Sequence, residues 1–294
     1  MRKNWQAKER LFKTGLIASG ALILLVVAGF TISLVFNSIP SLRQYGLSFI
    51  SKTEWDPENS SYGAFPFIFG TLITAFLALA ISLPFSLALT IFLGEYFKKG
   101  FFSSFIKAMV DLLAGIPSVV YGLAGVFFLI PVIQGLEAEI DVIPYGVGIV
   151  SASIVLALMI IPFSASLGKE VLELVPTDLK EGAYSLGATR FEVITKISVP
   201  YSISGIIAGI MLSLGRALGE TVAVTMLIGN MNSMPENIFS PGQTIASLIA
   251  NQFNEANDDM HRAALLELGL LLLVITAVIN IGGKLVIKKM SVEK

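Results

Sequence analysis

Apolar residues are gathered into six long segments, separated by shorter polar stretches. Each segment is long enough to cross the hydrocarbon core of a bilayer as a helix, which takes about 20 residues. The pattern predicts an all-α polytopic membrane protein, with one transmembrane domain over 14–287 and polar termini at 1–13 and 288–294. The predicted spans are 14–36, 67–94, 105–131, 145–167, 199–230 and 264–287.

The polar stretch 177–200, TDLKEGAYSLGATRFEVITKISVP, has a helical pattern of its own. Thr177 can cap a first short helix. Gly187 falls where a helix ends in a left-handed residue. Thr189 and Glu192 have the spacing of a capping box, which begins a second helix. The stretch is therefore predicted to form two short helices that meet at Gly187.

The first of these helices is expected to carry an apolar knob, formed by Leu179, Ala183 and Leu186 at i, i+4 and i+7. A small apolar face with charged flanks, projecting from a membrane protein, is typical of a docking element. The alternative is an ordinary amphipathic connector. The residues predicted to dock are Asp178, Leu179, Glu181, Gly182, Ala183, Leu186 and Gly187.

Composition supports the membrane assignment and excludes several kinds of chemistry. Hydrophobic residues make up 54% of the chain, charged residues make up 14%, and mean hydropathy is +0.79. The chain has no cysteine and one histidine, His261, so it offers neither a thiolate nor a histidine cluster for a metal. It also lacks the G-x-x-x-x-G-K-[ST] phosphate loop. We therefore expect no metal, no cofactor and no ATP hydrolysis by this chain.

Lysine and arginine are retained on the cytoplasmic side of a membrane, so their distribution predicts the orientation. With the amino terminus inside, the predicted outer loops hold only Arg43, Lys52 and Arg262, and Arg216 lies within a span. Both termini and the 177–200 stretch are then cytoplasmic. The first apolar run is too long for a signal-peptide core, so we expect a retained anchor helix. The basic residues on the inner side are Arg2, Lys3, Lys8, Arg10, Lys13, Lys98, Lys99, Lys107, Lys169, Lys180, Arg190, Lys196, Lys284, Lys288, Lys289 and Lys294.

The predicted outer loops have two possible roles. The loop over 37–66 combines aromatic and turn-forming residues, and the loop over 231–263 contains an apolar run, Ile245–Ile249, that could dip back toward the membrane. These loops are either solvated connections or a platform for an extracytoplasmic solute receptor.

Arg216 and Glu220 form a charged pair inside the fifth predicted span, in the motif GRALGET. Four residues apart, they are expected on one helical face and within ion-pairing reach. A charge at mid-helix costs about 2.5–3.5 kcal/mol on insertion scales, so it indicates a polar cavity or a functional need. Arg216 would attract an oxyanion. Glu220 would either hold Arg216 or accept a hydrogen from a protonated oxyanion, which would favour phosphate over sulfate. The alternative is a self-neutralising pair that only orients the helix.

Small and polar residues share one face of the same span. Gly205, Gly209, Ser213, Arg216 and Glu220 recur at steps of four, four, three and four, which predicts that this face lines a cavity. The two glycines also form a G-x-x-x-G motif, which favours close packing against a helix of a second membrane subunit.

The third predicted span is interrupted at Pro117, which removes a backbone hydrogen bond and kinks a helix. Irregular backbone is tolerated within a membrane where it is buried or lines a cavity. The accessible hydroxyls there would be Ser118 and Tyr121, although a packing kink without ligand contact is an equal alternative. The predicted substrate pathway comprises Arg216, Glu220, Ser118, Tyr121 and Thr221.

The stretch 177–200 resembles the cytoplasmic coupling loop of ABC importer permeases, with the pattern Glu-Ala-Ala, three residues, Gly, nine residues, Ile-x-Leu-Pro. The sequence matches this pattern at Glu181, Ala183, Gly187, Ile197 and Pro200, and departs from it at Gly182 and Val199. Because glycine weakens a helix by roughly 1 kcal/mol relative to alanine, Gly182 is expected to soften the joint without removing it.

Five segments carry a narrower resemblance: YGAFPFIFGT, LAGIPSVVYG, the coupling loop, GRALGETVAV and GQTIASLIANQF…HRAALLELG. They look like the bacterial high-affinity phosphate ABC importer, and the last segment favours one of its two homologous permease subunits. The resemblance implies a type I importer permease in the bacterial inner membrane, with Arg216 and Glu220 on the phosphate path. It also implies a second permease, two ATPase subunits, an extracytoplasmic phosphate-binding protein and surrounding lipid, and no nucleic acid.

Three other functions remain as alternatives. A permease for molybdate or sulfate would use the same arginine. An ion-coupled secondary transporter would also use intramembrane charges, but would have no need of a docking helix. An integral-membrane hydrolase is the weakest alternative, since the single histidine lies in a predicted outer loop.

Overall fold

The computed structural model describes residues 2–97 and 100–291, and most of these are helical. The first half contains α1 (Arg2–Tyr45), α2 (Ser48–Ser51), β1 (Trp55–Asp56), β2 (Ser61–Tyr62), α3 (Phe65–Ile91), the π-helix η1 (Phe92–Tyr96), α4 (Phe101–Gly115), α5 (Ser118–Ala124), the π-helix η2 (Gly125–Leu129) and α6 (Ile130–Glu139). The second half contains α7 (Ile149–Glu173), α8 (Thr177–Ser185), α9 (Arg190–Val193), the π-helix η3 (Ile194–Ser198), α10 (Val199–Leu218), α11 (Val222–Leu227), α12 (Ile245–Gln252) and α13 (Asp259–Ser291).

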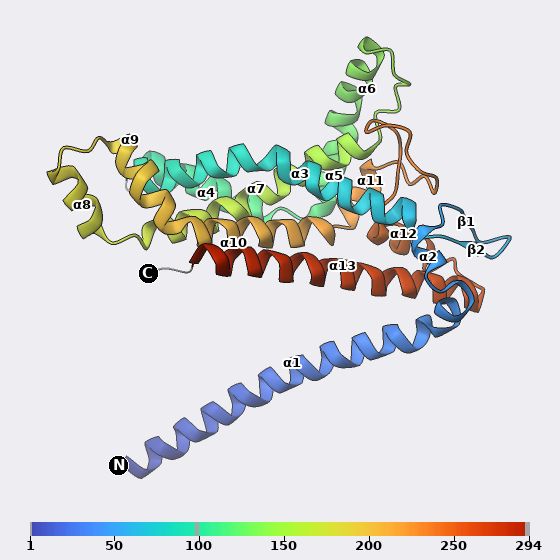
Figure 1. Ribbon diagram of the computed structural model, residues 1–294, viewed down its shortest axis with the longest axis horizontal. Coiled ribbons are helices and arrows are strands. Elements are labelled where there is room, and N and C mark those ends of the chain that lie inside the picture. The colour runs from blue at the N-terminus through green and yellow to red at the C-terminus, as the bar shows by residue number, and fades with distance from the viewer. Residues whose placement is uncertain (1, 98–99, 292–294) are drawn as a thin grey trace.

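The long helices α3, α7, α10 and α13 run side by side as a bundle (Figure 1). One end of the bundle, which we call the loop end, carries α8 and α9. The opposite end, the hairpin end, carries the two-stranded antiparallel β1–β2 hairpin and α12. Helix α1 meets α13 near the hairpin end and then leaves the bundle, so that the start of α1 and the end of α13 both point toward the loop end.

Within the described residues, six helices are long and apolar enough to span a membrane, as predicted. Their bounds correct two predictions. The third is Ser118–Glu139 instead of 105–131, because the chain is extended at Pro117 (ψ 141°) and splits that segment into α4 and α5. The fifth is Arg190–Leu218 instead of 199–230, because the helix ends at the C-cap Gly219.

Small residues let α10 pack closely on α7, which corrects two further predictions. A side-chain carbon at Gly205 would lie 2.4 Å from Cγ1 of Val171, and one at Gly209 would lie 3.1 Å from Cβ of Leu167. Ser213 is buried on the same face. The G-x-x-x-G motif therefore packs within this chain, and most of the face predicted to line a cavity is a packing surface.

An aromatic core fixes the hairpin end. Trp55 packs edge-on against Tyr62 and Phe67, with ring centroids 4.9 Å and 5.2 Å away, and its Nε1 donates to Oε1 of Gln252 at 2.9 Å. The apolar run Ile245–Ile249 forms most of α12, whose buried side chains join this core. The run is therefore held by the rest of the protein as a short capped helix.

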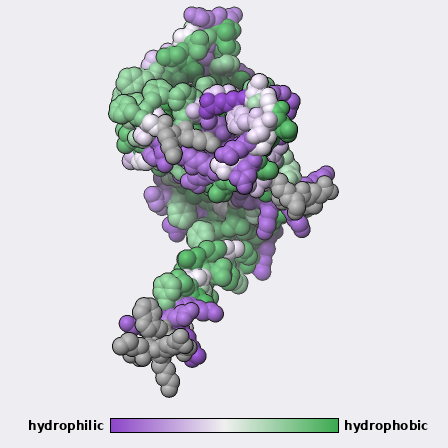
Figure 2. All heavy atoms as spheres, turned by 90° about the vertical axis from the view of Figure 1, so that its left-hand side faces the viewer, coloured by the Kyte–Doolittle hydropathy of each residue, from purple (hydrophilic) through white to green (hydrophobic). Residues whose placement is uncertain are grey.

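The polarity of the surface differs between the loop end and the sides of the bundle. Figure 2 looks onto the loop end, where hydrophilic residues gather, whereas α1 is apolar over most of its visible length. Large apolar side chains along α1, such as Leu24 and Phe36, are exposed. This distribution fits a bundle whose sides lie in lipid and whose loop end lies in water.

Candidate functional site

Helix α8 begins without the predicted cap and ends at the predicted glycine. Pro176 occupies its N-cap position, so Thr177 is the first helical residue and makes no capping hydrogen bond, contrary to the prediction. The end follows the prediction, with Gly187 at φ +83°. Its N–H donates to the Tyr184 carbonyl at 3.0 Å, and the Ala188 N–H donates to the Ala183 carbonyl at 3.1 Å. These two bonds form a Schellman motif, which turns the chain sharply away from α8.

The second predicted helix begins with the predicted capping box. The Thr189 N–H donates to Oε2 of Glu192 at 3.0 Å, and the Glu192 N–H donates to Oγ1 of Thr189 at 3.3 Å. Helix α9 then continues through η3 into α10. The end of the loop is thus the beginning of the fifth spanning helix.

The apolar knob on α8 points outward at the loop end. Leu186 is 91% exposed and Leu179 is 47% exposed, while Ala183 is partly buried. Tyr184 is also exposed and extends the apolar surface; the i, i+4, i+7 pattern missed it because it lies on the adjacent face. Large apolar side chains on a hydrophilic end indicate a surface that binds another protein. The other residues predicted to dock, Asp178, Glu181, Gly182 and Gly187, are all exposed.

Arg216 opens into a cavity of about 420 Å³ between α7, α10 and α13. It lies in the last turn of α10, and its Cζ is 4.2 Å from the centre of the Phe163 ring. Asn280 of α13 lines the same cavity and adds an amide group. A guanidinium and a carboxamide on one cavity can both donate hydrogen bonds to an oxyanion.

Glu220 does not lie on the helical face of Arg216, because α10 ends before it at Leu218. No ion pair joins the two side chains among the described residues, and Glu220 is not among those that line the Arg216 cavity. Instead, Oε1 of Glu220 accepts from the Ala223 N–H at 3.4 Å, at the start of α11. The prediction that Arg216 and Glu220 share one helical face within ion-pairing reach is therefore wrong, and so is the alternative of a self-neutralising pair.

The remaining predicted pathway residues lie around the two helix breaks. Ser118 begins α5, and the Tyr121 hydroxyl donates to the Leu113 carbonyl at 2.9 Å, across the break at Pro117. Helix α5 packs against α11, which follows Thr221. Tyr121 lines a cavity of about 280 Å³ that is separate from the Arg216 cavity. The breaks are thus neighbours, but the predicted residues do not share one pocket.

Sequence reasoning missed Asn280 and Phe163 as neighbours of Arg216. The available signal for Asn280 was a carboxamide within the last apolar segment. Phe163 gave no signal, because a phenylalanine in a spanning helix is ordinary.

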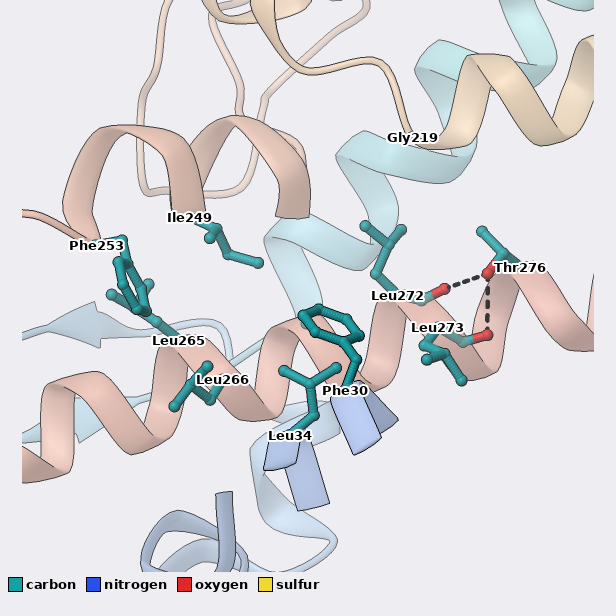
Figure 3. A pocket seen from close by; sticks show the side chains of 11 residues that line it. Phe30, Leu34, Gly219, Ile249, Phe253, Leu265, Leu266, Leu272, Leu273 and Thr276 are labelled. Carbon is teal, nitrogen blue, oxygen red and sulfur yellow. Dashed lines mark hydrogen bonds between the residues drawn. The ribbon is translucent and has the colours of Figure 1, made fainter. Parts of the chain in front are cut away.

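A larger cavity, of about 570 Å³, lies between α1, α12, α13 and the end of α10 (Figure 3). Phe30 and Leu34 reach into it from α1, and the described residues that line it are apolar apart from Thr276. The Thr276 hydroxyl donates to the carbonyls of Leu272 and Leu273, both at 2.9 Å. None of the described residues that line this larger cavity is a lysine or an arginine. The Arg216 cavity is therefore the better candidate for an anion site.

Comparison with known proteins identifies the family. Residues 86–292 match the family model described as binding-protein-dependent transport system inner membrane component. The phosphate transport system permease protein PstC of Haemophilus influenzae is 44% identical, over 97% of this chain and 95% of the relative. The probable phosphate transport system permease protein PstC of Methanocaldococcus jannaschii is 37% identical, over 86% of this chain and 85% of the relative.

The fold also matches a solved structure. A chain of the MetNI methionine ABC transporter, in an inward-facing conformation, aligns with a TM-score of 0.58 over 78% of this chain and 94% of that chain. Its sequence is 17% identical, so the match concerns the fold alone. The predicted fold class and the resemblance carried by the motifs are both confirmed. The chain is therefore a transport component of the binding-protein-dependent inner membrane family, with the fold of type I ABC importer permeases, and belongs among the PstC-type phosphate transport permeases.

Proposed function

We propose that this chain is the transmembrane permease of an ATP-driven phosphate importer and forms half of its translocation pathway. The relatives named as phosphate transport permeases support the substrate, and the family of binding-protein-dependent systems supports a receptor. The partners are a homologous second permease, two ATPase subunits and an extracytoplasmic phosphate-binding protein.

The loop end faces the cytoplasm in this proposal, and both termini lie on that side of the bacterial inner membrane. The distribution of basic residues supports this orientation, because they are concentrated toward the loop end. The hairpin end has Arg43, Lys52 and Arg262. The described basic residues toward the loop end include Lys8, Arg10, Lys13, Lys169, Lys180, Arg190, Lys196, Lys284, Lys288 and Lys289.

Arg216 provides the positive charge on the phosphate path. The observation that carries this proposal is its exposure to a cavity inside a bundle of spanning helices, beside Asn280. The planar guanidinium can bind an oxyanion through two parallel hydrogen bonds. Glu220, which does not pair with Arg216, accepts the hydrogen of a protonated phosphate in this proposal. Ser118, Tyr121 and Thr221 supply hydroxyl groups near the helix breaks along the same route.

ATPase closure drives alternating access through α8. The knob formed by Leu179, Ala183 and Leu186 binds in a groove of the ATPase and transmits its motion to the third, fourth and fifth spans. Its exposure at a hydrophilic end supports this role.

The proposal is tested in proteoliposomes that contain the complete transporter. In Arg216→Gln, uptake should fall by roughly 10-fold or more, because a hydrogen bond to a charged group contributes about 1.5–3 kcal/mol. Arg43→Gln removes an exposed arginine of α1 and is the matched control. Normal uptake by Arg216→Gln would contradict the anion-path role.

Two further measurements in the same vesicles separate the alternative functions. One is competition between phosphate and other oxyanions, and the other is whether ATP or an ion gradient drives uptake. Sulfate and molybdate should not compete with phosphate; if either competes strongly, the chain is a permease for another oxyanion. Uptake should require ATP. Uptake that an ion gradient drives without the ATPase would identify a secondary transporter.

A further inference from the structure

Glu95 is a buried carboxylate at the point where the α8–α9 loop meets the second spanning helix. It belongs to η1, which extends α3, and it is 8% exposed. Its Oε1 lies 2.5 Å from Nζ of Lys180, which is 7% exposed. Two opposite charges that are buried at this distance attract each other strongly, and removing either partner of a buried charge pair is destabilising.

Arg190 holds the same segment through its backbone. One terminal nitrogen of its guanidinium donates to the Glu95 carbonyl at 2.5 Å and to the Tyr96 carbonyl at 2.9 Å. Its Cζ also lies 4.3 Å from the centre of the Tyr96 ring. Carbonyls at the end of a helix lack helical partners and carry partial negative charge, so a cation stabilises them. Lys180 of α8 and Arg190 of α9 thus both bind η1.

The held segment is in turn packed against the bundle. A side-chain carbon at Gly94 would lie 3.1 Å from Cβ of Leu172 in α7, and Leu172 is fully buried. The Ser103 hydroxyl of α4 donates to the Phe97 carbonyl, immediately after η1. The π-helical turn η1 therefore lies between the loop, α3 and α7.

Helix α8 has little other contact with the bundle. Of its nine residues, all of which the structure describes, Lys180 alone is buried. The apolar knob is on the outside and Lys180 on the inside, so a force applied to the knob reaches the bundle through Lys180 and through the continuation of the loop into α10.

We infer that Glu95 is a positioning residue of the transport cycle: it binds α8 to the end of α3, so that displacement of α8 moves α3 and, through the Gly94–Leu172 contact, α7. The inference rests on the proposed function, because it takes α8 as the helix that docks the ATPase. It adds the second span to the helices that receive the motion and assigns that step to one buried charge pair.

The test measures phosphate uptake and ATP hydrolysis together in proteoliposomes that contain the complete transporter. Glu95→Gln and Lys180→Met should each retain the ATPase subunits and hydrolyse ATP, while phosphate moved per ATP falls by roughly 5-fold or more, the lower range of coupling between distant sites. Lys196→Gln is the matched control, because it breaks the exposed Lys196–Glu192 pair (3.0 Å) of the same loop. It should leave the ratio unchanged.

The charge-exchanged variant Glu95→Lys/Lys180→Glu should restore the ratio of phosphate moved to ATP hydrolysed. The inference is overturned if Glu95→Gln and Lys180→Met keep the wild-type ratio, or if the exchanged variant remains as poorly coupled as they are. It is also overturned if both single variants lose the ATPase, since the pair would then only maintain the shape of the loop. If the wild-type chain does not bind an ATPase subunit, the proposed function itself is contradicted.

Discussion

The charge of Arg216 is accommodated by its position at the end of a helix. It lies in the last turn of α10, where the partial negative charge of the helix terminus stabilises a cation, and the Phe163 ring lies 4.2 Å from its Cζ. Neither contact neutralises the guanidinium as a carboxylate would. Arg216 can therefore attract an anion more strongly than it could if Glu220 were paired with it.

A negative charge introduced at Asn280 should weaken phosphate transport. Asn280→Asp places a carboxylate on the Arg216 cavity, where it would pair with the guanidinium and repel phosphate. It should reduce uptake more than Asn280→Ala, which removes only the amide. The measurement is uptake over a range of phosphate concentrations, with Ile281→Ala, at a 60% exposed neighbouring position, as the control. Equal uptake by Asn280→Asp and wild type would contradict the assignment of this cavity.

Local and tertiary features differ in how well the sequence predicts them. Gly187 and the Thr189–Glu192 capping box were predicted correctly, because their geometry depends on residues within a single turn. The neighbourhood of Arg216 and Asn280 could not be predicted, because it depends on how α10 lies against α13. The expected pairing of Arg216 with Glu220 failed because the helix that would have aligned them ends before Glu220.

At the scale of elements, hydropathy predicts the number of spanning helices better than their ends. Six spans were expected and six are present among the described residues. The apolar pattern continues through both breaks, so it could not show where α4 or α10 ends. Pro117 was expected to kink one helix, but it separates two, and the Tyr121 hydroxyl joins them by its bond to the Leu113 carbonyl.

The exposed knob of α8 should lose its partner when it acquires charge. Leu186→Asp places a carboxylate on the most exposed residue of the knob and should abolish copurification of the ATPase, because an unpaired charge would be buried in the ATPase groove. Ile143→Asp makes the same kind of change at a 61% exposed residue of the α6–α7 connection, and should retain the ATPase. If Leu186→Asp copurified and transported normally, α8 would not be the docking helix.

At the scale of the whole molecule, an even number of spans requires both termini to lie on the same side of a membrane. The arrangement of the helices agrees with this requirement. The start of α1 and the end of α13 point toward the loop end, as does the α8–α9 loop, while the β1–β2 hairpin lies at the opposite end (Figure 1). This layout agrees with the grouping of basic residues toward the loop end.

Labelling can determine the orientation directly, since the natural chain contains no cysteine. A single cysteine at Ser185, on α8, should react with a membrane-impermeant maleimide only after intact cells are permeabilised. A single cysteine at Glu58, in the β1–β2 hairpin, should react in intact cells. Both positions are exposed. The reverse pattern would invert the proposed topology.

The departure of α1 from the bundle has a practical consequence for isolating this protein. The apolar cavity of Figure 3 lies between α1 and α13, and the apolar tails of detergents are chemically suited to enter it. In detergent, α1 would then contact the rest of the chain mainly at its junction at the hairpin end. The angle between α1 and the bundle would vary. Extraction within a polymer-bounded disc of native bilayer should preserve its angle where a micelle would not.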